Sequence, residues 1–190
     1  YIIYGVNHES FNKKTDFTIS SSICDATAIA PVLKIIDDNY SIENAFVTTL
    51  HPWLGYQNLL DGPSKSYAVP GTIIDNYALG RSSPMALIPK NTSAVRATCK
   101  ILKNLEDKII SNSFRVPTNI VSSADITIKV KKDITKEDLS NLLNKFSEEQ
   151  PNILMNNYEA LISTDFIGSD VSVTVDHRFL NVHHNYIKLI

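Results

Sequence analysis

Hydrophobic positions along the chain switch between strand-like and helix-like spacing, which predicts a mixed architecture. Apolar residues at i, i+3, i+4 and i+7 predict a helix from Cys24 to Asp38, and Thr92 and Thr135 are placed to cap two later helices. Runs rich in β-branched and aromatic residues predict strands. They occupy residues 1–6, 16–20, 43–50, 108–116, 121–131, 159–163, 170–176 and 183–190.

The order of these elements predicts the fold class. Within 121–131 apolar and polar residues alternate, which is typical of a sheet with one buried and one wet face. Helices and strands are interspersed, and adjacent strands are expected mostly in hairpin order. We therefore predict an α+β fold, with an antiparallel-rich mixed β-sheet and helices packed on one face.

Residues 52–90 break this pattern. They hold five of the eight prolines and four of the six glycines, with little periodicity. A loop of this length inside a compact domain is uncommon and usually serves function or an interface.

Composition narrows the classes of partner. The 190 residues carry a net charge of -2 and are 43% hydrophobic, as in an ordinary globular domain. Without a basic stripe, nucleic acid is not an expected partner. The apolar runs are shorter than the ~20 residues that span a membrane. Two cysteines are too few for a disulfide framework, so we expect a reducing, cytoplasmic location.

The strongest candidate chemistry lies in Cys24 and His51. Cys24 stands at a predicted helix start, and His51 ends the next predicted strand. Helix N-termini and imidazolium groups lower a thiol pKa from ~8.5 into the range of about 3.5–7.5. Such a pair is suited to covalent attack on an aldehyde with histidine as the base. Spacing alone also fits a buried structural thiol and an ordinary strand-end histidine.

No metal site is expected from the spacing of cysteines and histidines. His183 and His184 are adjacent, so in a strand they would point to opposite faces. His177 lies near the same strands and gives no further ligand pattern.

Nine short motifs, in order, resemble the catalytic half of a phosphorylating glyceraldehyde-3-phosphate dehydrogenase. They are Tyr4-Gly-Val-Asn-His8, Ser22-Ile-Cys24, Ala30-Pro-Val32, Asp38-Asn39, Thr48-Thr-Leu-His51, Asp61-Gly-Pro-Ser64, Ile88-Pro89, Phe114-Arg-Val-Pro-Thr118 and Ser163-Thr-Asp-Phe166.

This resemblance carries several implications. Residues 1–23 would be the tail of a missing dinucleotide-binding domain, and residues 24–190 a catalytic domain without the family's final helix. NAD or NADP would be bound mainly by the missing domain, so the fragment alone should be inactive. The substrate would be a small-molecule aldehyde, the parent a homo-oligomer, Cys24 the nucleophile and His51 the base.

Two residues beside Cys24 depart from the family. Ile23 and Asp25 replace the serine and threonine that help to bind the attacking inorganic phosphate. Asp25 would repel that phosphate and oppose thiolate formation. It would also stabilise the helix N-terminus, typically by about 0.3–1 kcal/mol; both effects can hold.

The resemblance implies further substrate-binding residues. Thr92 and Arg115 match family positions that contact phosphate, although a helix cap and a surface ion pair are equally compatible with them. The family's loop arginine falls on Leu79, and Arg81 is a candidate substitute.

Three functions remain open from sequence. The first is an NAD(P)-dependent aldehyde oxidoreductase that uses Cys24 and His51. The second is a non-phosphorylating aldehyde dehydrogenase, and the third is a catalytically retired paralogue that acts as a binding or assembly module. The reactivity of Cys24 separates the third from the others.

Overall fold

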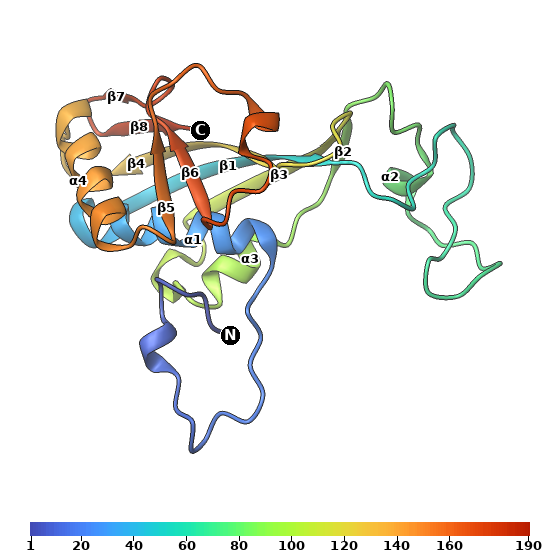
Figure 1. The fold of residues 1–190 in the computed structure, drawn as a ribbon, viewed down its shortest axis with the longest axis horizontal. Coiled ribbons are helices and arrows are strands. Elements are labelled where there is room, and N and C mark those ends of the chain that lie inside the picture. Colours follow the sequence, from blue (N-terminus) through green and yellow to red (C-terminus); the bar gives the residue numbers. More distant parts are fainter.

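The computed structural model describes residues 1–190 and contains a six-stranded sheet (Figure 1). The sheet order is β2-β3-β1-β4-β8-β7, and every neighbouring pair is antiparallel except β1 and β3. A separate parallel pair joins β5 to β6. The strands are β1 (Ile42–Pro52), β2 (Ile88–Lys90), β3 (Ile109–Val116), β4 (Ser123–Val130), β5 (Leu154–Asn157), β6 (Val173–Asp176), β7 (Asn181–His183) and β8 (Tyr186–Leu189).

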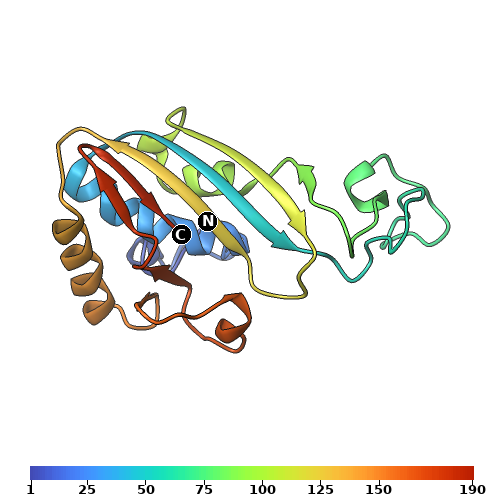
Figure 2. The ribbon, with the colours of Figure 1, turned by 90° about the horizontal axis from the view of Figure 1, so that it is seen from above.

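Helices cover one face of the sheet, which confirms the predicted α+β class. In Figure 1, α1 and α3 lie on one side of β1 and β3, and α4 lies at one end. Seen from above in Figure 2, the opposite face of β1, β3 and β4 has no helix in front of it. No helix is both long and apolar enough to cross a membrane. The helices are α1 (Cys24–Tyr40), α2 (Tyr77–Gly80), α3 (Ala94–Cys99), α4 (Lys136–Glu149) and the 3₁₀ turns η1 (His8–Ser10), η2 (Lys103–Leu105) and η3 (Ser163–Phe166).

The core forms where α1 and α4 meet the sheet. The helical spacing of apolar residues in α1 buries Val32, Leu33 and Ile36 in a cluster of 22 residues. This packing fixes the position of α1 and therefore of its first residue, Cys24. The predicted cap of α4 is also confirmed. The Asp138 amide donates to Thr135 Oγ1 at 3.1 Å, and the Thr135 amide donates to the Asp138 carboxylate at 3.3 Å.

Three strand predictions are wrong. Residues 1–6 and 16–20 form turns and irregular chain around η1, with only Ile3 buried near the start of α1. Residues 159–163 follow β5 and lead into η3. A β-branched run becomes a strand only where a neighbouring strand receives its backbone hydrogen bonds. Between 1–6 and 16–20 there is one such bond, from the Ile2 amide to the Ser20 carbonyl at 2.9 Å, which is too few for a ladder.

The expected hairpin order is also wrong at the centre of the sheet. β1 lies between β3 and β4, and within this sheet only β2–β3 and β7–β8 pair as sequence neighbours. The segment 52–90 forms the predicted long loop, an arm that reaches away from the sheet in both views and carries α2 (Figures 1 and 2). Several of its large apolar side chains are exposed, including Leu59, Leu60, Tyr67 and Met85.

His183 and His184 do not point apart as expected. His184 has a φ of 52° and belongs to the turn between β7 and β8, so it leaves the alternation of a strand. The two rings meet edge to face, with centroids 4.5 Å apart.

His177 is a buried, neutral histidine with a structural role. Its Nδ1 lies 3.1 Å from Ser140 Oγ, and its Nε2 donates to Asn156 Oδ1 at 2.8 Å. Burial, followed by the positive charge of Lys136, lowers the pKa of His177. The side chains around it therefore connect α4 to β5 through the uncharged ring.

We expect stability to fall in acid because of His177. Its folded-state pKa lies below the unfolded value of about 6.5, so the unfolded chain takes up the proton first as pH falls. Above about pH 6.5 the ring is neutral in both states and does not reduce the free energy of unfolding. Below that pH the free energy of unfolding falls, by at most about 1.4 kcal/mol per pH unit. Urea unfolding at several pH values should show a shallower acid loss in His177→Gln. An unchanged slope in that variant would contradict the prediction.

Candidate functional site

Sheet register brings the candidate polar residues to one face. His51 pairs with Arg115 across β1 and β3, and Arg115 pairs with Ile88 across β3 and β2. Lys90 lies two residues beyond Ile88, so it points to the same side. Thr49 is also on that side and is buried. His51, Arg115 and Lys90 therefore gather on the helix-covered face, at the end of the sheet where α1 begins.

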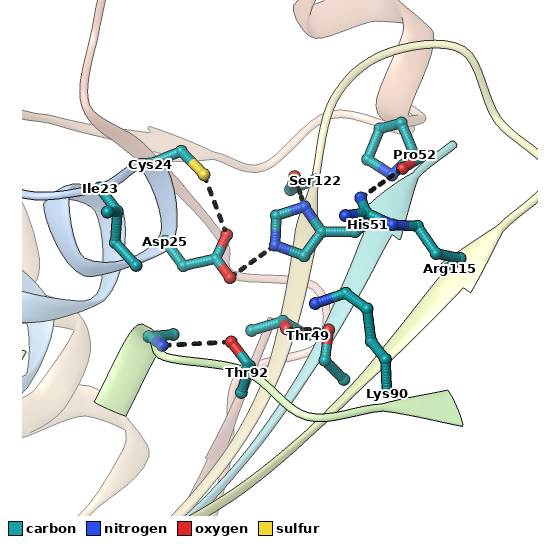
Figure 3. Close-up of polar contacts among 12 residues, drawn as sticks. Ile23, Cys24, Asp25, Thr49, His51, Pro52, Lys90, Thr92, Arg115 and Ser122 are labelled. Carbon is teal, nitrogen blue, oxygen red and sulfur yellow. Dashed lines mark hydrogen bonds and ion pairs between the residues drawn. The ribbon is translucent and has the colours of Figure 1, made fainter. Parts of the chain in front are cut away.

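Asp25 lies between the predicted nucleophile and the predicted base (Figure 3). His51 Nε2 is 2.6 Å from Asp25 Oδ2, and the Cys24 thiol donates to Asp25 Oδ1 at 3.7 Å. Asp25 is only 6% exposed, whereas Cys24 is an exposed residue. The structure thus brings Cys24 and His51 to the same place, but it joins them through a carboxylate.

The second imidazole nitrogen of His51 also has a partner. Ser122, in the turn before β4, places its Oγ 3.2 Å from His51 Nδ1. With Asp25 on one nitrogen and Ser122 on the other, the orientation of the ring is held from both sides. The Ser122 hydroxyl donates when Nδ1 is unprotonated and accepts when Nδ1 carries a proton.

The surroundings of Cys24 disfavour a thiolate. Partial burial of the sulfur raises the pKa of the Cys24 thiol, and the negative charge of Asp25 raises it further. This direction is opposite to the lowering expected from a helix N-terminus and a neighbouring imidazolium. The expectation that Asp25 opposes thiolate formation agrees with this result. The thiol is therefore poorly ionised at neutral pH while Asp25 keeps its charge.

Two cations without acidic partners lie beside this cluster. Arg115 Nη1 donates to the Pro52 carbonyl at 2.7 Å, and Lys90 Nζ donates to the Asn91 carbonyl at 3.2 Å. Neither belongs to any ion pair of the chain, so the surface ion pair considered for Arg115 is wrong. Both line a cavity of about 490 Å³ together with Tyr56 and Leu79.

The surroundings of both cations disfavour their charged forms. Burial lowers the pKa of Lys90, to which the nearby charge of Arg115 also contributes, and it lowers the pKa of Arg115. The Asp25 carboxylate already favours the charged form of both groups, and an anion bound between them would favour it further. The side of the cavity formed by Lys90 and Arg115 therefore suits an anion, whereas Asp75 on the same cavity wall opposes one.

The other two predicted site residues lie differently. Thr92 Oγ1 accepts from the Ala94 amide at 3.1 Å at the start of α3, but the N-cap residue of that helix is Ser93, one position later than predicted. Arg81 Nε binds Asp61 Oδ1 at 3.0 Å in the arm, with both side chains more than half exposed. Arg81 does not line the cavity of Lys90 and Arg115. The structure therefore does not bring it to the position expected for a substitute phosphate ligand.

Sequence reasoning missed three features of this site. Lys90 and Ser122 belong to no motif, and only the register of β2, β3 and β4 places them beside His51. The spacing of cysteines and histidines also indicated no metal site. In the structure, however, Cys24, Asp25 and His51 each offer a ligand atom within 4.8 Å of the others. Residues 26 positions apart in sequence give no spacing signal for such a cluster.

The chain is similar to known proteins over almost its whole length. Residues 23–190 match the family model described as glyceraldehyde 3-phosphate dehydrogenase, C-terminal domain. The cytosolic glyceraldehyde-3-phosphate dehydrogenase of Chlamydomonas reinhardtii is 34% identical over 190 residues, which cover 99% of this chain and 53% of that protein. Glyceraldehyde-3-phosphate dehydrogenase 1 of Candida glabrata is 34% identical over 99% of this chain and 54% of its own length.

A bacterial relative gives the same result. Glyceraldehyde-3-phosphate dehydrogenase of Chlamydia pneumoniae is 34% identical over 92% of this chain and 50% of its own length. The chain thus spans about half the length of the curated relatives it matches. With a domain model covering residues 23–190 and an α+β sheet of the expected class, the chain belongs to the glyceraldehyde-3-phosphate dehydrogenase family, in the region of its C-terminal catalytic domain.

Proposed function

We propose that this chain is the aldehyde-binding and carbon–sulfur bond-forming part of an NAD(P)-dependent aldehyde oxidoreductase. The observation that carries the proposal is the convergence of the exposed Cys24 thiol and the His51 imidazole on the Asp25 carboxylate. Nucleophile and proton-handling groups are thereby within reach of one substrate atom.

The covalent step uses only groups of this chain. The Cys24 thiol gives its proton to the His51 imidazole, which is the base, through the Asp25 carboxylate that contacts both groups. The sulfur then attacks the carbonyl carbon, and the carbon–oxygen π bond becomes an alkoxide. The proton returns to that oxygen, which yields a thiohemiacetal. The net reaction is the addition of a thiol to an aldehyde, and it consumes no external acid or base.

The hydride acceptor must be bound by other residues. The six glycines of the chain never fall in the spacing G-x-G-x-x-G, so the phosphate-binding loop of a dinucleotide site is not found here. NAD or NADP does not fit a site built from these residues alone. We therefore assign to this chain only the chemistry of the aldehyde and the thiol.

The cavity of Lys90 and Arg115, which neither Cys24 nor His51 lines, indicates which aldehydes fit. Lys90 and Arg115 offer an ammonium and a guanidinium without acidic partners, so an aldehyde with an anionic end gains two charge-assisted contacts. Ile23 and Asp25, in contrast, offer no hydroxyl to an attacking phosphate. A charge repulsion of about 1 kcal/mol in water, and ~4 kcal/mol at an effective dielectric of 20, acts at ~4 Å from a carboxylate. Capture of a thioester by water is favoured over capture by phosphate.

We expect anionic aldehydes to protect Cys24 from alkylation better than neutral aldehydes of the same length. The measurement is the rate of iodoacetamide labelling at Cys24, read by mass spectrometry. Lys90→Ala should remove most of the preference for anionic aldehydes. The expected loss of this preference is about ten-fold or more, because one charge-assisted contact of roughly 1.5–3 kcal/mol is removed. The matched control is Lys132→Ala, an exposed lysine between β4 and α4. Equal protection by both aldehydes would contradict this substrate class.

Dehydrogenation is tested separately. Formation of NADH or NADPH is followed with the aldehyde, using a protein in which this chain is joined to a dinucleotide-binding domain, with and without inorganic phosphate. Activity that does not need phosphate supports release of the thioester to water. If no aldehyde protects Cys24 and no reduced cofactor forms, the proposed enzyme function fails.

A retired paralogue that acts as a binding module is the second candidate. The raised pKa of Cys24 and the engagement of His51 by Asp25 favour it, because both weaken the nucleophile. This candidate predicts that Cys24 alkylates slowly at every aldehyde concentration. It also predicts that aldehydes do not protect Cys24 from alkylation in the Asp25→Asn protein either.

A further inference from the structure

We propose that Cys24, Asp25 and His51 form a binding site for a divalent transition-metal ion of the zinc class. The three ligand atoms lie within 4.8 Å of one another. A thiolate, a carboxylate and an imidazole are a ligand set that zinc accepts, and three protein ligands with one open position are typical of its reactive sites.

The ligand atoms lie near the separations of a tetrahedral site, but the Asp25 carboxylate must turn, because its two oxygens contact Cys24 and His51 separately. Zinc bonds of about 2.3 Å to sulfur and about 2.1 Å to nitrogen and oxygen place sulfur and oxygen roughly 3.6 Å apart in a tetrahedron. The corresponding distance from Cys24 Sγ to Asp25 Oδ1 is 3.7 Å. The nitrogen–oxygen separation would be about 3.4 Å. Asp25 Oδ2 and His51 Nε2 are 2.6 Å apart, so this pair opens by less than about 1 Å when the ion replaces the shared proton.

Ser122 supplies the support that a ligating histidine needs. Its Oγ lies 3.2 Å from His51 Nδ1, where it accepts a proton held on Nδ1 and leaves Nε2 free for the metal. Such a partner on the second ring nitrogen orients the ligand and selects its tautomer. Binding therefore releases the thiol proton of Cys24, and affinity should rise with pH.

The charge of the site is compatible with a bound ion. The Cys24 thiolate and the Asp25 carboxylate together neutralise a divalent cation. Lys90 and Arg115 oppose a bare cation and favour an anion or hydroxide at the fourth position. Because Cys24 is exposed, that fourth position faces solvent.

Metal binding and aldehyde attack exclude each other at this sulfur. A thiolate coordinated to the ion cannot bond to a carbonyl carbon at the same time, so the metal would hold the site inactive. The inference does not require the aldehyde chemistry, because the ligand set is complete without a substrate. It adds a binding function that also remains possible for a retired module.

The test is a titration of the reduced chain with Co²⁺ alone, followed by absorbance. We expect saturation at one ion per chain, visible bands of four-coordinate cobalt and a near-ultraviolet thiolate charge-transfer band, all removed by Zn²⁺. Cys24→Ser should abolish the charge-transfer band, and Cys99→Ser, at the other cysteine, should leave it intact. Asp25→Asn and His51→Gln should each weaken binding by at least the roughly 10–100-fold that loss of a supporting residue costs.

Several results would overturn the proposal. They are a charge-transfer band that persists in Cys24→Ser, the absence of any saturable band in the parent chain, and parent-like affinity in Asp25→Asn. Circular dichroism of each variant shows that the fold is retained before the titrations are compared. A Ser122→Ala variant gives an independent check through a smaller loss of affinity, because Ser122 positions His51 without touching the metal.

Discussion

The Asp25→Asn protein is expected to alkylate at Cys24 about ten-fold faster than the parent at pH 7. Asp25 raises the pKa of this thiol through its charge and its contact with the sulfur. The repulsion between two like unit charges about 4 Å apart costs about 1 kcal/mol in water and ~4 kcal/mol at an effective dielectric of 20. A change of 1.36 kcal/mol shifts a pKa by about one unit, which is ten-fold in thiolate at a pH below the pKa.

The pH dependence gives the sign of this effect. In the parent, labelling should climb only as pH rises above the ordinary thiol range, because burial and Asp25 both favour the protonated form. In Asp25→Asn the same curve should move to lower pH. The apparent pKa of Cys24 in Asp25→Asn should stay above that of an activated thiol, because the partial burial of the sulfur remains.

The measurement is the rate of iodoacetamide labelling against pH, read by mass spectrometry at Cys24 and Cys99 separately. Cys99 is a buried thiol at the end of α3 and reports any general opening of the fold. Asp38→Asn is the matched control, because it removes a carboxylate from the opposite end of α1. A parent-like curve in Asp25→Asn would show that Asp25 does not restrain the thiol. Adding His51→Asn to Asp25→Asn tests whether the released imidazole then activates Cys24.

The Leu33→Ala protein is expected to lose about 2–5 kcal/mol of unfolding free energy. Leu33 is fully buried in the main core, where α1 packs against the sheet. Its truncation removes apolar contacts and leaves a cavity that the close-packed neighbours fill only in part. A domain is typically stable by about 5–15 kcal/mol, so this loss is a large fraction of the total.

Urea unfolding, followed by circular dichroism, measures this loss. Lys34→Ala is the matched control on the next residue of α1. It removes an exposed ion pair with Asp38 that is worth about 0.3–0.5 kcal/mol. A loss in Leu33→Ala no larger than in Lys34→Ala would contradict the assignment of Leu33 to the core. Because the same packing holds the first turn of α1, Cys24 labelling should also become less selective over Cys99 in Leu33→Ala.

Local patterns predicted the parts of the fold that depend on few neighbours. The capping box of α4 and the alternation of β4 involve residues adjacent in the chain or on one face of one strand. The apolar stripe of α1 is equally local, and all three predictions are confirmed. The strands expected at 1–6 and 16–20 failed, because a strand also requires a partner that local sequence does not specify.

The candidate site divides in the same way. Cys24, His51 and Arg115 were predicted from motifs and from the resemblance, because their positions follow from a helix start and two strand ends. The roles of Lys90 and Ser122 depend on which strands are neighbours and in what register. No pattern within one element contains that information.

The sequence by itself determined the α+β class and most of the helices and strands, and it selected Cys24 and His51 as the candidate thiol and imidazole. Only the tertiary structure decided that the Asp25 carboxylate stands between them and that two cations without acidic partners line the adjacent cavity. The physical reason is the distance along the sequence over which each effect acts. Propensity, capping and amphipathic spacing act over a few residues, whereas charge, burial and hydrogen bonding at this site join α1, β1, β2, β3 and the turn before β4.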